Sequence, residues 1–107
     1  MGSIDTDWKT LRAELPDDVR ARLDAKRNER RLGKALADVR KAMQATQQEV
    51  AARAGMTQNT ISKIERADDV LLSSVVRYMR SIGGGVELVL KTPDGKESRV
   101  DLTPEPN

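Results

Sequence analysis

The 107-residue chain has room for one small hydrophobic core, because chains of this size bury only a modest fraction of their surface. It has no cysteine and no histidine, which excludes disulfides, thiolate nucleophiles, imidazole bases and the usual zinc ligands. No loop groups its carboxylates at cation-binding spacing, and no apolar run approaches the roughly 20 residues that cross a bilayer. The composition therefore predicts a cytoplasmic, non-membrane protein with neither metal nor cofactor.

Charge is unevenly distributed along the chain, although the net charge is only +2. Residues 26–66 carry ten Lys or Arg and four Asp or Glu, whereas the stretches on either side are net acidic. A basic centre favours a polyanionic partner, since lysine and arginine neutralise phosphates. Taken alone, the run from Lys26 to Lys34 is better explained as the solvated face of a helix, with phosphate binding as the alternative.

The N-terminal part predicts a helix that Pro16 interrupts. Residues 5–15 are weakly helical, and a proline disfavours helix in the residue before it. Asp17 can cap the next helix, which we expect to run from Asp18 towards Met43.

The second half of this long helix carries an apolar pattern at spacings of four, three and four, formed by Leu32, Leu36, Val39 and Met43. This pattern predicts the core-facing side of the helix. Gly33 lies within it, and a glycine weakens a helix by about 1 kcal/mol relative to alanine, which predicts a break nearby.

Residues 46–66 read TQQEVAARAGMTQNTISKIER and predict two short helices joined at a glycine. Thr46 and Glu49 form the capping-box pattern at the start of the first helix. Gly55 suits the left-handed turn that ends it, and Thr57 caps the second helix.

The same stretch has the small and apolar residues that a helix-turn-helix requires. Ala51 lets the second helix approach, Gly55 makes the turn, and Ile61 and Ile64 hold the second helix on the core. Short capped helices also occur in proteins that bind no DNA. The joint pattern within the basic stretch nevertheless predicts DNA binding.

The outward residues of the second helix can recognise bases. Glutamine and asparagine can pair bidentately with an adenine edge in the major groove, and lysine favours guanine acceptors. The candidate base-reading residues are Gln58, Asn59, Thr60 and Lys63. Thr46, Gln47 and Thr57 stand at helix N-termini, where backbone amides favour phosphate oxygens, so we expect them to position the protein on DNA.

After residue 66 the pattern predicts one more helix and a β-hairpin. The helix starts at Ser73 or Ser74 and ends at the glycines 83–85, and its inner residues are Val75, Val76, Met79 and Ile82. Alternating apolar residues then flank a turn at residues 92–95. An isolated hairpin is marginal in water, so its apolar face must cover the helices or pair with a second copy.

Residues 32–82, above all TQQEVAARAGMTQNTISKIER, resemble the helix-turn-helix domain of lambdoid phage repressors and Cro, the xenobiotic-response-element type. The resemblance implies a mainly α fold, a four- to five-helix repressor-like bundle followed by the hairpin. It also implies that Gln47 contacts phosphate and braces Gln58. Arg40 is expected to pair with Glu65 behind the recognition helix, near a phosphate.

The segment ERADDVLLSSVVRYMRSIGGGVELVL with a second strand resembles HigA-type antitoxins, which repress their own toxin–antitoxin operon. This resemblance implies a homodimer on palindromic double-stranded DNA, and an RNA-cleaving toxin as protein partner. The expected domains are an N-terminal extension over 1–31, a helix-turn-helix domain over 32–82, a hairpin over 83–102 that can serve dimerisation, and a tail over 103–107.

The sequence is also compatible with other functions. The extension over 1–31 could contact toxin or pack on its own domain. The protein could be a stand-alone regulator of host or phage genes, or an interaction module that has kept the fold without binding DNA. An enzyme is disfavoured because residues 83–107 are too few to enclose the Ser-Lys dyad of self-cleaving repressors.

Overall fold

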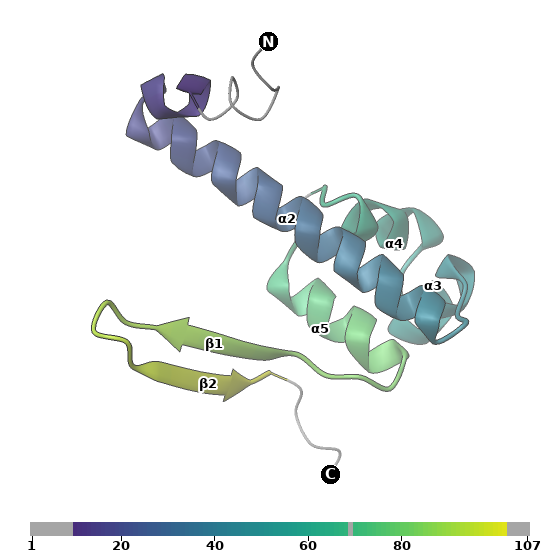
Figure 1. Cartoon of the computed structure of the whole chain (residues 1–107). Coiled ribbons are helices and arrows are strands. Elements are labelled where there is room, and N and C mark those ends of the chain that lie inside the picture. Colours follow the sequence, from purple (N-terminus) through teal and green to yellow (C-terminus); the bar gives the residue numbers. More distant parts are fainter. Residues whose placement is uncertain (1–9, 69, 103–107) are drawn as a thin grey trace.

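The computed structural model describes residues 10–68 and 70–102 of the chain. Its elements are α2 (Asp17–Ala42), α3 (Gln47–Ala54), α4 (Gln58–Glu65), α5 (Leu72–Ser81), β1 (Glu87–Lys91) and β2 (Glu97–Asp101) (Figure 1). Residues 10–14 are also helical; the start of the helix expected over 5–15, like the tail from 103, lies outside the described residues. This mainly helical chain with a C-terminal hairpin confirms the predicted fold class.

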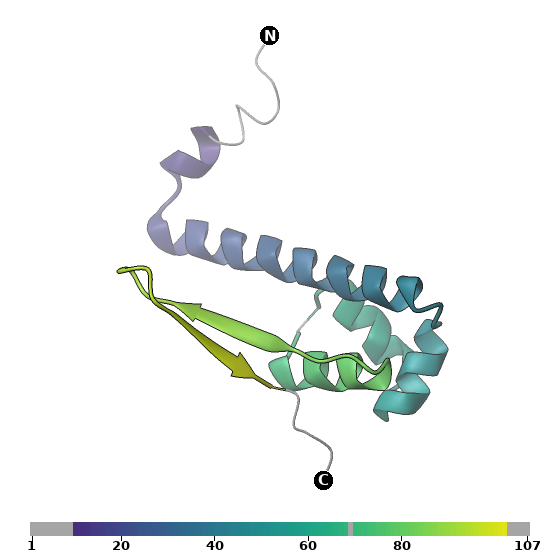
Figure 2. The same ribbon diagram turned by 60° about the horizontal axis from the view of Figure 1, so that its bottom comes forward.

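The core lies between the C-terminal half of α2 and the three shorter helices, and the N-terminal half of α2 projects beyond it (Figures 1 and 2). Ile61, Val50 and Tyr78 are the largest completely buried side chains. The core residues are aliphatic apart from the tyrosine: Leu36, Ala45, Val50, Ala51, Ile61, Ile64, Val75, Tyr78 and Ile82.

Helix α2 begins differently from the sequence-based expectation and has no break. Pro16 occupies the N-cap position without a side-chain cap, so Asp17 is the first helical residue and not the cap. The helix continues through Gly33, where a break was expected. Gly33 is buried against α4, and a Cβ built there would lie 2.6 Å from the carbonyl oxygen of Glu65. The glycine therefore permits close helix packing.

The buried side of α2 is also rotated from the predicted one. Of the four residues in the apolar pattern only Leu36 is buried, together with Gly33 and Arg40. The other three are exposed by 39–59%: Leu32, Val39 and Met43. The prediction was wrong because α4 approaches α2 at the glycine, which turns the flanking apolar residues away from the core.

Helix α5 starts at Leu72, slightly before the predicted serines, and its N-cap residue Leu71 makes no side-chain cap bond. Val75 and Ile82 are buried as expected, while Met79 is partly buried against the core. Gly83 has φ +81, a left-handed conformation suited to the turn that follows the helix.

The hairpin pairs β1 and β2 in antiparallel register, with Val89 opposite Arg99. Gly95 donates its amide to the Thr92 carbonyl at 3.0 Å, as expected of the predicted turn. All of β2 is exposed, and Leu88 alone in β1 is half-buried. The hairpin therefore covers the helices only near its base, where Val86 packs against the core. Within the described residues, no helix is long and apolar enough to cross a membrane.

Candidate nucleic-acid interface

Both helices of the candidate DNA-binding unit begin with the predicted threonine caps. Thr46 Oγ1 accepts the amide of Glu49 at 3.1 Å, and Glu49 Oε1 accepts the amide of Thr46 at 3.1 Å, which completes a capping box. These bonds from Thr46 lower the pKa of Glu49 below its ordinary value. Thr57 Oγ1 accepts the amide of Thr60 at 3.1 Å at the start of α4. The caps fix where each helix begins.

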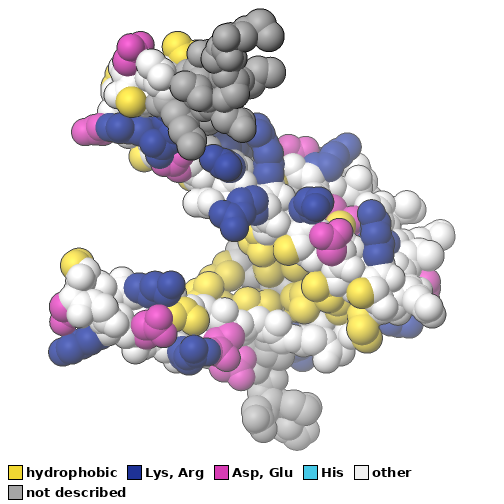
Figure 3. Space-filling model, in the orientation of Figure 1, with side chains coloured by type: hydrophobic (Ala, Val, Ile, Leu, Met, Phe, Trp, Pro, Cys, Tyr) yellow, Lys and Arg dark blue, Asp and Glu magenta, His cyan; other side chains and the backbone are white. Residues whose placement is uncertain are grey.

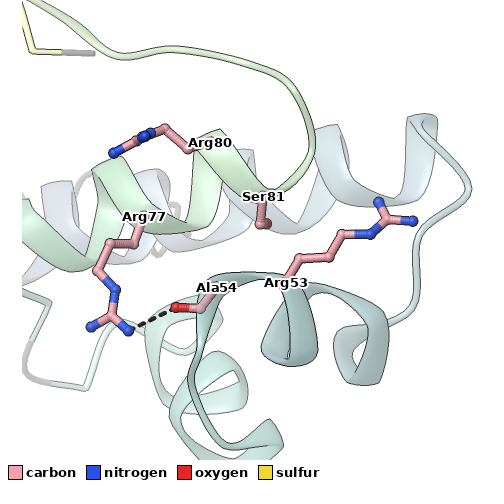
Figure 4. A pocket seen from close by; sticks show the side chains of 5 residues that line it. All are labelled: Arg53, Ala54, Arg77, Arg80 and Ser81. Atoms are coloured by element: carbon pink, nitrogen blue, oxygen red, sulfur yellow. Dashed lines mark hydrogen bonds between the residues drawn. The ribbon is translucent and has the colours of Figure 1, made fainter. Parts of the chain in front are cut away.

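The turn between α3 and α4 has the predicted glycine and a contact that the sequence analysis missed. Gly55 adopts φ +68, a left-handed conformation that L side chains resist. Arg77 of α5 donates Nη2 to the carbonyl oxygen of Ala54 at 2.7 Å (Figure 4). The same nitrogen also donates to the carbonyl oxygen of Gly55 at 3.1 Å. This guanidinium satisfies carbonyls that lack partners at a helix C-terminus and ties the turn to α5.

Helix α4 has a buried side and an exposed polar side. Ile61 and Ile64 are buried, as predicted, and hold the helix on the core. Gln58, Asn59 and Lys63 are exposed on the other side. These three side chains can reach a molecule outside the chain, and their contacts with bases remain a prediction.

Thr60 differs from the other three candidate base-reading residues. It is half-buried, and its hydroxyl lies 2.9 Å from the hydroxyl of Thr57. A base contact by Thr60 would have to share a hydroxyl that already serves the N-terminal cap.

The predicted pairing of Arg40 with Glu65 is present behind the recognition helix. Arg40 donates Nε to Glu65 Oε2 at 2.7 Å and Nη2 to Glu65 Oε1 at 2.9 Å. A third bond runs from Arg40 Nη1 to the carbonyl oxygen of Ala45 at 2.9 Å. The Arg40 and Glu65 side chains are only 10% and 7% exposed. The pair joins the end of α4 to α2, and a phosphate contact by Arg40 remains a prediction.

Glu65 also receives bonds from α3 and α5. The Tyr78 hydroxyl lies 2.7 Å from Glu65 Oε2 and 3.1 Å from the Leu36 carbonyl oxygen, so its one hydrogen favours the carboxylate. Gln47 donates Nε2 to Glu65 Oε1 at 3.1 Å. In the described part of the chain, Gln47 therefore braces Glu65 and not Gln58, which corrects the expectation from the resemblance.

The Glu65 cluster, defined as Glu65, Arg40, Tyr78 and Gln47, holds its carboxylate and its guanidinium in their charged forms. Burial alone would raise the pKa of Glu65, but the bonds from Arg40, Tyr78 and Gln47 outweigh it and lower the pKa. The bond to Glu65 raises the pKa of Arg40, whereas burial and the same carboxylate raise the pKa of Tyr78. One charged residue at the end of α4 thus connects all four helices α2–α5.

Tyr78 was not singled out from the sequence. Its position between Val75 and Ile82, on the inward side of the predicted last helix, is the sequence feature that indicates its burial. A tyrosine that is buried usually needs a hydrogen-bond partner, and Glu65 provides it.

Arginines also line a hollow of about 340 Å³ between α3 and α5, together with Ala54 and Ser81. In Figure 4 the guanidinium groups of Arg53 and Arg80 point in different directions, and that of Arg77 is turned to the α3 carbonyl. Arg53 also lies 3.8 Å from Glu49. These cations do not converge on one point, so the hollow is not a built anion site.

Comparison with known proteins agrees with this geometry. Residues 31–83 match a family described as a helix-turn-helix domain. Antitoxin HigA1 of Mycobacterium tuberculosis (strain CDC 1551 / Oshkosh) is 42% identical over 69 residues, which cover 64% of this chain and 46% of the relative. HigA1 of strain ATCC 25618 / H37Rv matches with the same identity and coverage. The matched stretch spans less than half of each relative's length.

Proposed function

We propose that this chain, in which residues 31–83 match a helix-turn-helix domain family and 69 residues are 42% identical to HigA1 antitoxins, is a dimeric repressor that reads a palindromic operator and neutralises a toxin. The observation that carries this proposal is the exposed side of α4, where Gln58, Asn59 and Lys63 stand on a helix that Glu65 holds from behind. In this proposal the chain acts by binding and not by catalysis, in the cytoplasm.

Operator recognition places α4 in the major groove. The amides of Gln58 and Asn59 and the ammonium of Lys63 face base edges there, and Thr60 supports them from the cap. Phosphate groups bind at the N-termini of α3 and α4, where Thr46, Gln47 and Thr57 stand. Arg40, which lies behind these helices, also contacts a phosphate. In the dimer the two recognition helices enter successive major grooves about 34 Å apart.

The projecting part of α2 supports an antitoxin role over that of a stand-alone regulator. Residues 17–31 lie outside the core, and Arg12 of the preceding turn pairs with Asp24, donating Nε to Oδ1 at 3.0 Å. The turn at 10–14 is thereby fastened to the projecting helix. Leu23 is 38% exposed beside Arg27 and Arg30, which gives this surface an apolar anchor among cations. We assign this surface to an RNA-cleaving toxin whose operon the dimer represses.

DNA recognition is tested by measuring how tightly the Gln58→Ala and Asn59→Ala variants bind the operator and a scrambled duplex at one salt concentration. Each lost bidentate pair should reduce discrimination by about 1–3 kcal/mol at particular base pairs. Lys26→Ala and Arg31→Ala are the matched controls and should at most weaken binding to both duplexes alike. Unchanged discrimination by Gln58→Ala would remove Gln58 from the reading set. Wild-type protein that prefers no duplex would refute the proposal.

The toxin contact is tested by co-purification with the product of the adjacent open reading frame. Leu23→Asp should abolish capture of that product while operator binding is unchanged. Ala21→Asp is the matched control, because residue 21 is exposed on the opposite side of α2. Equal capture by both variants would move the toxin surface elsewhere.

A further inference from the structure

The sheet consists of β1 and β2 alone in the described chain, so the outer edge of β1 has no neighbouring strand. Two strands are marginal in water, and open edges readily pair with another chain. We infer that the edge of β1 pairs antiparallel with β1 of a second copy, with Val89 on the twofold axis. This inference rests on the proposed dimeric repressor and names the surface that joins its two copies.

The sequence of β1, Glu-Leu-Val-Leu-Lys, is complementary to itself when one copy runs antiparallel to the other. With Val89 opposite its own copy, Glu87 stands opposite Lys91 and Leu88 stands opposite Leu90, each twice. Opposite charges and apolar pairs across strands are stabilising, whereas like charges are not. Shifting the register by two residues would set Glu87 or Lys91 opposite Val89, so the centred register fits best.

The backbone of β1 presents the groups that this register requires. The Val86 carbonyl oxygen accepts the Leu102 amide at 2.9 Å, and the Thr92 amide donates to the Lys96 carbonyl at 2.9 Å, so even-numbered residues face β2. The alternation of an antiparallel ladder then turns the amides and carbonyls of Glu87, Val89 and Lys91 to the free edge. In the centred register these residues lie opposite one another and can exchange their hydrogen bonds.

The charges of Glu87 and Lys91 are suited to the pairing. Glu87 already accepts a bond from Arg99 Nη1 at 3.0 Å, and its second carboxylate oxygen can face the second copy. Lys91 is exposed and forms no ion pair among the described residues. Its complement in the centred register is the partner copy's Glu87.

The outer edge of β2 is less suited to self-pairing. Over its full length, Glu97-Ser-Arg-Val-Asp101 would set Glu97 opposite Asp101 and Arg99 opposite its own copy. Two copies of β2 can place opposite charges across from one another only in shifted registers, in which part of each strand is left unpaired. The observations therefore favour β1 over β2.

The surroundings of β1 also favour a second copy. β1 lies on the side of the hairpin nearer to α2 in both ribbon views (Figures 1 and 2). Figure 3 shows the surface hollowed between the hairpin and the projecting part of α2, with hydrophobic side chains on the floor. Leu90 is 56% exposed on β1, and Leu32 is 40% exposed on α2. A second hairpin would enter this hollow and create a four-stranded sheet with a continuous apolar face.

A charge-reversal pair tests the register in the full chain. In a homodimer of Glu87→Lys, a lysine at residue 87 of each copy faces Lys91 of the other copy. In a homodimer of Lys91→Glu, a glutamate at residue 91 of each copy faces Glu87 of the other copy. Each variant alone should raise the dimer dissociation constant by about tenfold to a hundredfold. An equimolar mixture should form a heterodimer of wild-type affinity, because the two lysines of one variant then face the two glutamates of the other, so both cross-strand pairs again join opposite charges. Sedimentation and native mass spectrometry measure both results.

The mixture also controls for damage within the hairpin, since each copy keeps its own internal defect. Lys96→Glu, in the exposed turn between the strands, is the matched control and should leave the dissociation constant within about threefold, because residue 96 lies outside the paired residues of β1. Wild-type monomers, single variants that dimerise like wild type, or a mixture that stays monomeric would overturn the inference.

Two further outcomes separate this inference from the proposed function. A wild-type dimer that responds to the charge reversals but does not discriminate operator DNA would overturn the function and support the interface. An operator-specific dimer indifferent to both reversals would overturn the interface alone. Binding of the β1 edge to toxin in place of a second copy would also overturn it.

Discussion

Gly33 of α2 lies directly against the backbone of Glu65, so that a Cβ at residue 33 would stand 2.6 Å from the Glu65 carbonyl oxygen. Real side chains essentially never make so short a contact, and the atom in the way is backbone, which cannot rotate aside. The absence of a side chain at one position of α2 therefore sets how closely the recognition helix packs.

Gly33→Ala should destabilise the protein even though alanine is the better helix former. Helix propensity alone would stabilise by about 1 kcal/mol, but overpacking costs about 1–3 kcal/mol because α4 must move. We expect a net loss of up to about 2 kcal/mol in the free energy of unfolding, measured in urea, with weaker operator binding. Asn28→Ala, at an exposed position of the same helix, is the control and should stabilise slightly. A stabilised Gly33→Ala protein would mean that the helices can separate without loss.

Tyr78→Phe tests the Glu65 cluster. The hydroxyl lies 2.7 Å from a buried carboxylate, and bonds to charged groups contribute about 1.5–3 kcal/mol. We expect a loss of that size in the free energy of unfolding. Ser81→Ala removes a neutral bond from Ser81 Oγ to the Tyr78 carbonyl and should cost less. In a Glu65→Gln background the tyrosine substitution should cost much less, and strict additivity would contradict a shared network.

Local features of this fold could be predicted from the sequence, because the residues that determine them are close together in the chain. Thr46 with Glu49, Gly55, and Thr57 form the caps and turn that the pattern indicated. The hairpin turn is equally local, since Gly95 and Thr92 bond across it. Such signals depend on backbone groups within four residues.

Features that depend on distant segments were missed or wrongly predicted. The contact between Gly33 and α4 determines which side of α2 is buried. A pattern of apolar residues cannot predict this side, because the buried residues include a glycine and an arginine. Tyr78 likewise acts through Glu65, which is thirteen residues away in sequence. Arg77 closes the turn after α3 from α5, over 23 residues. Only the packing of the helices brings these groups together.

The pKa of Glu65 predicts how stability depends on pH. Because folding lowers this pKa from its ordinary value of 4.5, the carboxylate contributes stability fully above that value. The contribution is lost as pH falls through the lower pKa of the folded state. Wild type should thus lose stability on acidification below about pH 5, whereas Glu65→Gln should be less stable at pH 7 and approach wild type in acid. Urea unfolding from pH 7 to pH 3 measures both curves, and parallel curves would remove Glu65 as the cause.

Truncation after Gly85 removes the hairpin and tests whether it joins the two copies. The truncated chain should sediment as a monomer and bind an operator half-site weakly, because one recognition helix then acts alone. Val86 packs against the core, so a companion variant ending at Val86 retains that contact, and helical circular dichroism checks that both chains fold. A truncated protein that stays dimeric would place the interface on the helices, where Leu32, Val39 and Met43 offer exposed apolar surface on α2. A monomer with full operator affinity would instead remove dimerisation from recognition.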